Sequence, residues 1–175
     1  ASIEKKPVKR SPSQPFITST LQQEASRKFG FSVNRTMSAA QKLYESGLIT
    51  YMRTDSPNIS EEALISIANE IKSSFGEVYL HQRRFKAKTA TAQEAHEAIR
   101  PTNIENKSIV ADRDMIKLYE LIWKRTIASQ MSDAKMERTV VKIDISTLSQ
   151  KQLEAVGEVL IFDGFLKVYI ESSDF

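Results

Sequence analysis

Residues 112–145, DRDMIKLYELIWKRTIASQMSDAKMERTVVKIDI, contain the change of hydrophobic period that decides the fold. In the first part, apolar side chains recur every three or four residues, which predicts a long helix beginning near Asp112. These apolar residues are Met115, Leu118, Tyr119, Ile122, Trp123 and Ile127. After Met131, apolar and polar residues alternate, which predicts a half-buried strand over 139–145. The chain therefore combines helices with β-structure.

Upstream of this stretch, three shorter segments have the same helical period: 19–29, 36–46 and 60–75. Ser19 and Gln22 fit a capping box at the start of the first segment, and Ser60 fits the N-cap of the third. In the second segment, the side chains expected to be buried are Met37, Ala40, Leu43 and Tyr44. Gly30 joins the first two segments into a candidate helix–turn–helix, a motif that reads DNA in only some proteins.

The remaining segments are less regular. Residues 81–92 have almost no apolar content and predict an exposed loop, and a short helix over 93–99 is expected before Pro101. Beyond the predicted strand, the apolar runs 156–162 and 165–170 indicate further β-structure. Asp163-Gly164 between these runs is typical of a hairpin turn.

The order of these elements predicts three parts of the chain. Residues 1–15 form a strand remnant and a linker, because their prolines exclude a stable helix. Residues 16–131 form a helical block, and residues 132–175 return to β-structure. This order is expected for a helical domain inserted into a β-rich domain, of which the chain contains only parts.

Composition excludes several classes of protein. The 175 residues include 25 Lys and Arg against 22 Asp and Glu, a net charge of +3 that permits an acidic partner such as nucleic acid without proving one. The absence of cysteine excludes disulfides, thiolate catalysis and cysteine-ligated zinc. With only His81 and His96, a histidine-rich metal cage is excluded as well. No apolar run approaches the ~20 residues that span a bilayer, and no signal peptide is recognisable, so a cytoplasmic protein is expected.

The densest cluster of polar residues is GLITYMRTDS at 47–56. If this segment is extended, Tyr51, Arg53 and Asp55 share one face. A tyrosine phenol, with a pKa near 10, needs a base or a cation to act as a nucleophile at neutral pH. An arginine can bind two phosphate oxygens at once. The cluster therefore fits phosphoryl transfer, but the spacing alone favours the alternative in which Tyr51 is a strand aromatic and Arg53 pairs with Asp55.

A second cluster is QEAHEAIRP at 93–101. On the predicted helix, His96 and Arg100 are four residues apart and face the same way. A histidine can bind a phosphate or move a proton near neutral pH. The alternative is a surface helix with an ordinary mixture of charges.

Four runs of residues together resemble one protein family. They are PFITSTLQQEAS at 15–26, GLITYMRTDS at 47–56, EAHEAIRPT at 94–102 and FDGF at 162–165. These motifs, in this order, are similar to those of the type IA DNA topoisomerases, and among them to the bacterial topoisomerase I group. The similarity extends over nearly the whole chain.

The resemblance implies a role for each candidate site residue. Tyr51 matches the catalytic tyrosine that cuts one DNA strand and holds its 5′ end as a phosphotyrosine. Arg53 matches the arginine that steadies the scissile phosphate. His96 matches the histidine beside the tyrosine, which assists DNA binding and phosphate chemistry, and Asp55 matches an aspartate suited to orienting it. Arg100 matches the last charged residue of the same motif, a DNA-binding position with a less defined role.

The resemblance also implies an architecture and partners. The expected fold is mainly α within an α+β whole: a helical catalytic-tyrosine domain with winged-helix-like helix–turn–helix features, inserted in a truncated β-rich arch. The expected partners are single-stranded DNA, negatively supercoiled DNA and the remaining domains of the same enzyme, with no membrane and a nucleoid-associated, cytoplasmic location.

The family also needs Mg²⁺, bound by an acidic domain that this chain lacks. Asp112-Arg-Asp114 is interpreted as a helix start and not as part of a metal site. No metal ligand is therefore assigned within the chain. The isolated fragment is expected to have no DNA-relaxing activity.

Two other functions are compatible with the residues. A non-catalytic nucleic-acid-binding module would use the helix–turn–helix and the basic residues of the linker and loop. These basic residues are Lys5, Lys6, Lys9, Arg10, Arg83, Arg84, Lys86 and Lys88. A purely structural domain would instead bury Tyr51 with its hydroxyl satisfied, far from His96.

Overall fold

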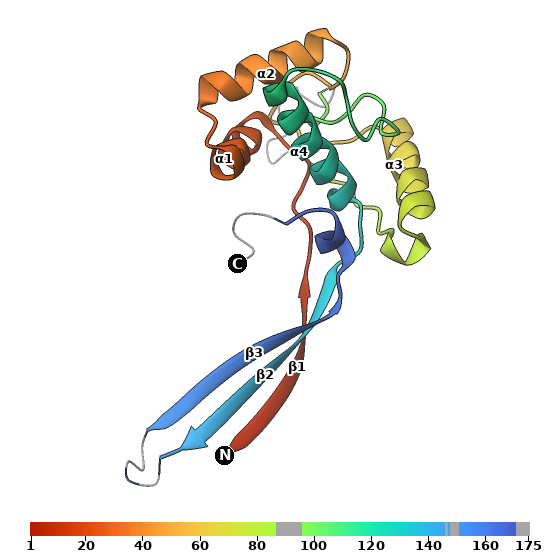
Figure 1. Cartoon of the computed structure of the whole chain (residues 1–175). Coiled ribbons are helices and arrows are strands. Elements are labelled where there is room, and N and C mark those ends of the chain that lie inside the picture. The colour runs from red at the N-terminus through yellow and green to blue at the C-terminus, as the bar shows by residue number, and fades with distance from the viewer. Residues whose placement is uncertain (87–95, 146, 148–150, 171–175) are drawn as a thin grey trace.

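The computed structural model describes residues 1–86, 96–145, 147 and 151–170. The elements, in chain order, are β1 (Ser2–Arg10), α1 (Thr18–Phe29), α2 (Val33–Glu45), α3 (Glu61–Ser74), the 3₁₀ turn η1 (Glu77–Tyr79), α4 (Arg113–Ser129), β2 (Ala134–Asp144), β3 (Gln152–Phe162) and the 3₁₀ turn η2 (Gly164–Lys167). The helices form a head, and the strands form a long arm that extends from it (Figure 1). The fold is therefore α+β.

The arm is a three-stranded antiparallel sheet with the order β1-β2-β3. β1 pairs with β2 from Ser2 opposite Lys142 to Arg10 opposite Ala134. The chain leaves the sheet after β1, forms helices α1 to α4 and returns in β2, so the helical head lies on one long excursion between two paired strands. Pro7, which has no backbone N–H, is tolerated because β1 is an edge strand whose outer edge has no partner strand among the described residues.

The two faces of the arm differ in chemistry. Residues directly opposite each other in the register share a face, so Ile3, Val141 and Ala155 lie together, as do Ile143 and Leu153. We call this the apolar sheet face; its exposed apolar members are Ile3, Ile143, Leu153 and Val159, and it also carries the Lys5–Glu137 ion pair at 2.8 Å. The other face carries a charged network in which Glu158 accepts from Arg10 at 3.3 Å and from Arg138 at 2.8 Å. Such alternation is expected when one face of a sheet is covered.

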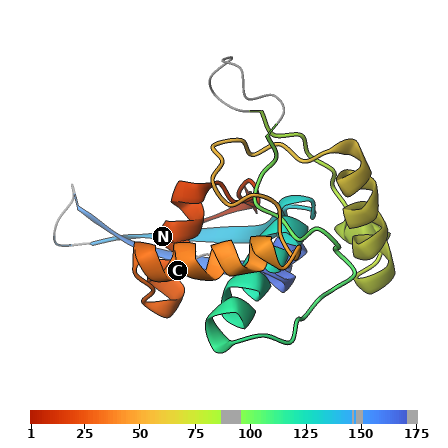
Figure 2. The same cartoon turned by 90° about the horizontal axis from the view of Figure 1, so that it is seen from above.

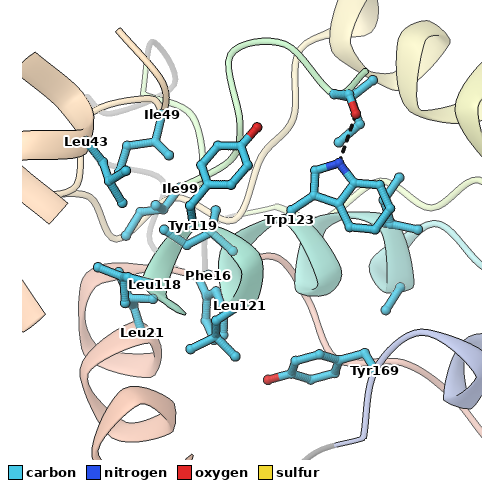
Figure 3. Close-up of a cluster of buried hydrophobic side chains, with 14 of the residues drawn as sticks. Phe16, Leu21, Leu43, Ile49, Ile99, Leu118, Tyr119, Leu121, Trp123 and Tyr169 are labelled. Carbon is cyan, nitrogen blue, oxygen red and sulfur yellow. Dashed lines mark hydrogen bonds between the residues drawn. The ribbon is translucent and has the colours of Figure 1, made fainter. Parts of the chain in front are cut away.

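Helix α4 is the centre of the head, with α3 on one side of it and α1 and α2 on the other (Figure 2). Its Leu118 and Ile122 are fully buried and belong to one continuous core with the aromatic side chain of Phe16. The Trp123 Nε1 donates to the Ile104 carbonyl at 2.9 Å, which satisfies the polar atom of a buried indole (Figure 3). Among the described residues, no helix is long and apolar enough to cross a membrane.

Two predicted helices are confirmed together with their caps. Ser60 Oγ accepts from the Ala63 N–H at the start of α3, and Asp112 Oδ1 accepts from the Met115 N–H at 3.0 Å at the start of α4. The interpretation of Asp112 as a helix-start residue is thereby confirmed. These two helices form where periodicity and capping agree.

The first two helices begin earlier than predicted. Helix α2 starts at Val33 and is capped by Ser32, not near residue 36. The capping box of Ser19 and Gln22 is wrong: Ile17 is the N-cap of α1, and its N–H donates to Thr20 Oγ1 at 3.1 Å. Tyr44, expected to be buried, is exposed, because its ring packs on another aromatic side chain at the surface.

Three further predictions are wrong where the structure tests them. Residues 96–99 are not helical, because Ile99 instead bridges Phe16, and residues 93–95 lie outside the described residues. The 165–170 segment contains η2 and not a strand. Asp163-Gly164 is not a hairpin turn. Of the predicted 81–92 loop, residues 81–86 have no helix or strand, and 87–92, with Lys88, lie outside the described residues.

Candidate active site

The segment of Tyr51 begins at a sharp reversal after α2. Gly47, just beyond the C-cap residue Ser46, has a φ of 70°, a left-handed conformation that glycine adopts without a Cβ clash. The Leu48 N–H donates back to the Leu43 carbonyl at 2.9 Å. Ile49 is then buried in the core and bridges Pro101. This turn delivers Tyr51 to the surface directly beside the hydrophobic core.

From residue 50 onward, side chains alternate between surface and core. Tyr51, Arg53 and Asp55 are exposed, with 44 % of Tyr51 accessible, whereas Met52 between them is only 1 % accessible. The segment is not a β-strand, since residues 52 and 53 form a bend. The predicted alternation of exposed and buried side chains is therefore present without a β-ladder, and of the three residues expected to share a side, Arg53 and Asp55 line one pocket.

Two threonine hydroxyls hold the segment in this conformation. Thr18, at the start of α1, donates through Oγ1 to the Met52 carbonyl at 2.7 Å and accepts from the Thr54 N–H at 2.9 Å. Thr50 donates through Oγ1 to the Ala98 carbonyl at 2.6 Å and accepts from the Arg100 N–H at 2.9 Å. Because backbone polar groups near a core need partners, these hydroxyls substitute for neighbouring strands.

Arg53, Asp55 and His96 line one open pocket of about 340 Å³ with Ile17, Thr18 and Ser19. The last three residues are the N-cap and first turn of α1. A helix N-terminus carries a partial positive charge and amide donors, and so favours anions. With the Arg53 guanidinium at the same pocket, this arrangement suits a phosphate group. Among the described residues, neither Arg53 nor His96 forms an ion pair, and both side chains are exposed to a ligand.

Tyr51 is not among the lining residues of that pocket. Its ring packs edge-on against Tyr44, with 5.1 Å between ring centroids and an interplanar angle of 62°. No hydrogen bond to its hydroxyl exists within the part of the chain that the structure describes, so the phenol is exposed and chemically accessible. A purely structural domain predicts a buried, satisfied Tyr51 hydroxyl, and the observed exposure contradicts that prediction.

Arg100 faces a different environment from His96. Its Nε donates to Glu97 Oε2 at 2.6 Å, and its Nη1 donates to the Pro101 carbonyl at 3.0 Å. Its side chain is largely buried in this ion pair and lines a second pocket with Ser60 and Asn103. The shared helical face predicted for His96 and Arg100 is therefore absent, because residues 96–99 do not form a helix.

Asp112 and Asp114, interpreted from the sequence as helix-start residues, stabilise the fold. Asp114 accepts two hydrogen bonds from Arg35, at 2.7 and 2.8 Å. This interaction lowers the pKa of Asp114, while the Met115 N–H, and then Lys42, lowers that of Asp112. Across the described residues, no group of three or more His, Cys, Asp or Glu side chains could hold a metal ion.

Sequence reasoning missed the helical wall of the pocket. Thr18 and Ser19 are more than 30 residues from Arg53 in the chain, and no pattern connects them. The only feature of the sequence that points to Thr18 and Ser19 is their position at the start of the first predicted helix. The loop cations were also misjudged: Arg83 is tied to Asp133 at 2.6 Å, and Arg84 is paired with Glu61.

Comparison with known proteins agrees with this site. The sequence profile of a family described as DNA topoisomerase matches residues 1–174. The chain is 50 % identical over 182 residues to a prokaryotic-type DNA topoisomerase 1 of Acanthamoeba polyphaga mimivirus, and 49 % identical over 176 residues to DNA topoisomerase 1 of Zymomonas mobilis. Each alignment covers 99 % of this chain, but only 21 % and 14 % of those relatives.

The fold is also that of a solved topoisomerase. The full-length topoisomerase I of Thermotoga maritima superimposes with a TM-score of 0.81 and 39 % identity, over 99 % of this chain and 30 % of that protein. The chain thus spans a small part of the proteins that it matches. From the profile match over nearly its whole length and from these relatives, the chain belongs to the type IA DNA topoisomerase family, in the bacterial topoisomerase I group.

Proposed function

We propose that the protein containing this chain is an ATP-independent DNA topoisomerase that cuts one strand through Tyr51 and relaxes negatively supercoiled DNA. The Tyr51 Oη attacks a backbone phosphorus, a P–O bond forms, and the bond to the 3′ oxygen breaks. The 3′ oxygen leaves with a proton, and the 5′ phosphate remains esterified to the tyrosine. The reverse reaction reseals the strand. Because one phosphoester replaces another, no external energy source is needed.

The observation that carries this proposal is the exposure of Tyr51 and Arg53 on either side of the buried Met52, with Arg53 lining an open pocket. Residues 52 and 53 form a bend, and Tyr51 is not among the residues that line the pocket of Arg53. The proposed chemistry therefore requires the Tyr51 side chain to rotate away from Tyr44 toward a phosphate that Arg53 holds. The α1 N-terminus favours an anion in the same pocket through its dipole, while the Ile17 and Thr18 N–H groups already donate to Thr20 Oγ1 and to the Thr54 carbonyl.

The other site residues have supporting roles in this mechanism. His96 binds the phosphate or carries the proton that moves between the phenol and the 3′ oxygen. Asp55 lies in the same pocket and suits the orientation of His96. Arg100 is engaged by Glu97, so we assign it an indirect effect on DNA binding: it holds the chain that follows His96.

Magnesium, which the family requires, does not fit a site in this chain, since no suitable cluster of ligands occurs within the described residues. Only Asp55 contributes a carboxylate to the pocket of Arg53. We therefore assign the ion to another part of the protein. The 175-residue chain alone is expected to lack DNA-relaxing activity.

The exposed apolar sheet face supports a second partner, the remaining domains of the same polypeptide. The strands that would cover it belong to the parts of the protein outside this chain. On this view, residues 16–131 are a helical tyrosine-bearing domain with winged-helix-like features, and residues 1–15 and 132–175 belong to a β-rich arch. Action on chromosomal DNA implies a cytoplasmic, nucleoid-associated enzyme whose substrate is a single-stranded segment.

A non-catalytic DNA-binding module fits the structure less well. Such a module would present free cations on α2, the second helix of the candidate helix–turn–helix. Instead, Arg35 and Lys42 on that helix are paired with Asp114 at 2.7 Å and Asp112 at 3.3 Å. A binding module also has no use for an exposed phenol beside Arg53.

The test uses the full-length protein and an end-labelled single-stranded oligonucleotide. Denaturing electrophoresis measures the covalent protein–DNA adduct. Tyr51→Phe is expected to abolish the adduct, whereas Tyr44→Phe, which keeps the neighbouring ring and leaves Tyr51 intact, is expected to retain it. Adduct formation by the Tyr51→Phe protein would refute the proposal.

A further inference from the structure

Four lysines line a concave pocket that shares no residue with the pocket of Arg53. The pocket has a volume of about 390 Å³ and lies between the end of α1, the side of α4 and the turn η2. We call it the lysine pocket, and its cations are Lys28, Lys117, Lys124 and Lys167. These residues come from three elements that are distant in sequence, so no local pattern predicts that they meet.

The lysine pocket is strongly positive. Glu120 is the one carboxylate among its lining residues, which leaves an excess of three positive charges. This excess equals the net charge of the whole 175-residue chain. Like charges that gather in a hollow raise the local potential and attract anions.

Two of the lysines form no close ion pair among the described residues, although Lys117 contributes to lowering the pKa of Asp114 on the same helix. Lys28 donates to the Ile170 carbonyl and lies 5.1 Å from the centre of the Tyr169 ring. Lys117 lies 5.4 Å from the centre of the Phe29 ring. Lys124 is paired with Glu120 at 2.6 Å, and Lys167 is only loosely paired with Asp163 at 3.9 Å. Lys28 and Lys117 are thus held by aromatic rings and a carbonyl and remain available to an external anion, whereas Lys124 is engaged by Glu120, and Lys167 also donates to the Tyr79 hydroxyl at 3.4 Å.

Two other basic clusters within the described residues are neutralised by close ion pairs. On α2, Arg35 and Lys42 face the carboxylates of Asp114 and Asp112. On the arm, Arg138 is paired with Glu158 at 2.7 Å. In those places fold-stabilising ion pairs already neutralise the charge, so the lysine pocket is the better candidate for an anionic ligand.

We propose that the lysine pocket binds the phosphate backbone of a nucleic-acid strand, away from the site of cleavage. Lysine is a compact point charge that suits phosphate. Cations lie over the rings of Phe29 and Tyr169, so these rings are not free to stack on bases as in sequence-tolerant single-strand sites. The contact is therefore with phosphates and is independent of base sequence. This inference rests on the proposed function, since it assumes a protein that handles DNA.

The first measurement is the salt dependence of DNA binding by the full-length protein. Fluorescence anisotropy follows a labelled single-stranded oligonucleotide for the wild type and for a variant with Lys28, Lys117, Lys124 and Lys167 changed to Gln. Each lost phosphate contact lowers the slope of log affinity against log salt by about 0.7, so the slope is expected to fall by about 2 to 3. The matched control changes four exposed lysines elsewhere to Gln: Lys5, Lys6, Lys72 and Lys142.

The second measurement locates the contact without any substitution. Lysines of the wild-type protein are acetylated with and without the oligonucleotide, and mass spectrometry measures each site. The four lysines of the pocket are expected to be protected several-fold by DNA, and the four control lysines are not. Equal protection of both groups, or equal salt slopes for the two variants, would overturn the proposal. So would pocket-dependent binding to anionic lipid vesicles with unchanged DNA binding.

These outcomes separate the inference from the cleavage chemistry. The pocket variant is expected to form the Tyr51 adduct at saturating DNA, because it leaves Arg53 and His96 intact. If the wild type forms no adduct through Tyr51, the proposed function fails. If the adduct forms but the lysines neither change the slope nor gain protection, only the lysine pocket fails.

Discussion

Changing Thr18 to valine tests whether hydrogen bonds to the backbone hold Tyr51 in place. Valine has nearly the shape of threonine but lacks the hydroxyl. In the wild type, this hydroxyl donates to the Met52 carbonyl at 2.7 Å and accepts from the Thr54 N–H at 2.9 Å. The substitution therefore removes two contacts on either side of Arg53 and leaves the hydrophobic contacts nearly unchanged.

The magnitude follows from the two backbone groups that lose a partner. A partly buried donor or acceptor without a partner costs about 1 to 1.5 kcal/mol when water reaches it in part, so the free energy of unfolding is expected to fall by about 2 to 3 kcal/mol. Arg53 also loses its fixed position relative to the α1 N-terminus. Misplacement of a substrate-positioning group by about 1 Å can cost about 100-fold in rate. The rate of adduct formation is expected to fall at least tenfold.

Two assays on the full-length protein measure these effects: urea denaturation and the rate of covalent adduct formation. Thr18→Ser is the matched control, because it keeps the hydroxyl and loses only a methyl group, and it is expected to remain close to the wild type in both assays. If Thr18→Val and Thr18→Ser form adduct at the same rate, the hydroxyl does not position the segment and the reasoning is refuted.

Three further predictions concern other parts of the molecule. The Arg35 hydrogen bonds hold the pKa of Asp114 below its ordinary value, so the stability that they contribute is present above about pH 4 and is lost as the pH falls below it. In acid denaturation, the Asp114→Asn protein should be less stable than the wild type at pH 7 and should lose less stability on acidification. A Cβ at Gly164, where φ is 51°, would lie 2.4 Å from the Asp133 carbonyl oxygen. Gly164→Ala should therefore lower the free energy of unfolding by about 3 kcal/mol or more, whereas Gly157→Ala, where the added Cβ meets open space, should lower it by less than about 1 kcal/mol. Equal urea midpoints for the two variants would contradict this prediction. Arg53→Lys should slow adduct formation about tenfold or more, because a point charge cannot bind two phosphate oxygens as a fork does, and an unchanged rate would argue against that role.

Local signals predicted the parts of the fold that depend on local forces. The apolar period and the caps Ser60 and Asp112 predicted α3 and α4, since capping and periodicity act within a few residues. The strands are longer than the alternation indicated, with β3 beginning at Gln152 and not near residue 156. Hydrogen bonding to β2 extends the strand beyond the segment whose side chains alternate.

The predictions for residues 93–99 and for the surroundings of Arg53 failed because contacts between residues distant in sequence decide the conformation there. A helix over 93–99 fits the local composition, but Ile99 bridges Phe16, and the Ala98 N–H donates to the Asn58 carbonyl at 2.8 Å. For the site, the sequence pattern identified residue types that suit phosphate chemistry. It could not identify Thr18 as the residue that holds Met52 and Thr54, because this contact spans more than 30 residues of chain.

The central claim is that the Tyr51 oxygen becomes esterified to a cut DNA strand. The most direct measurement is mass spectrometry of peptides from the trapped adduct of the full-length protein, after digestion of both protein and DNA. The peptide that contains Tyr51 is expected to carry the mass of a 5′-linked nucleotide, while the peptide that contains Tyr44 remains unmodified. A nucleotide on Tyr44, or on any other residue, would contradict the account.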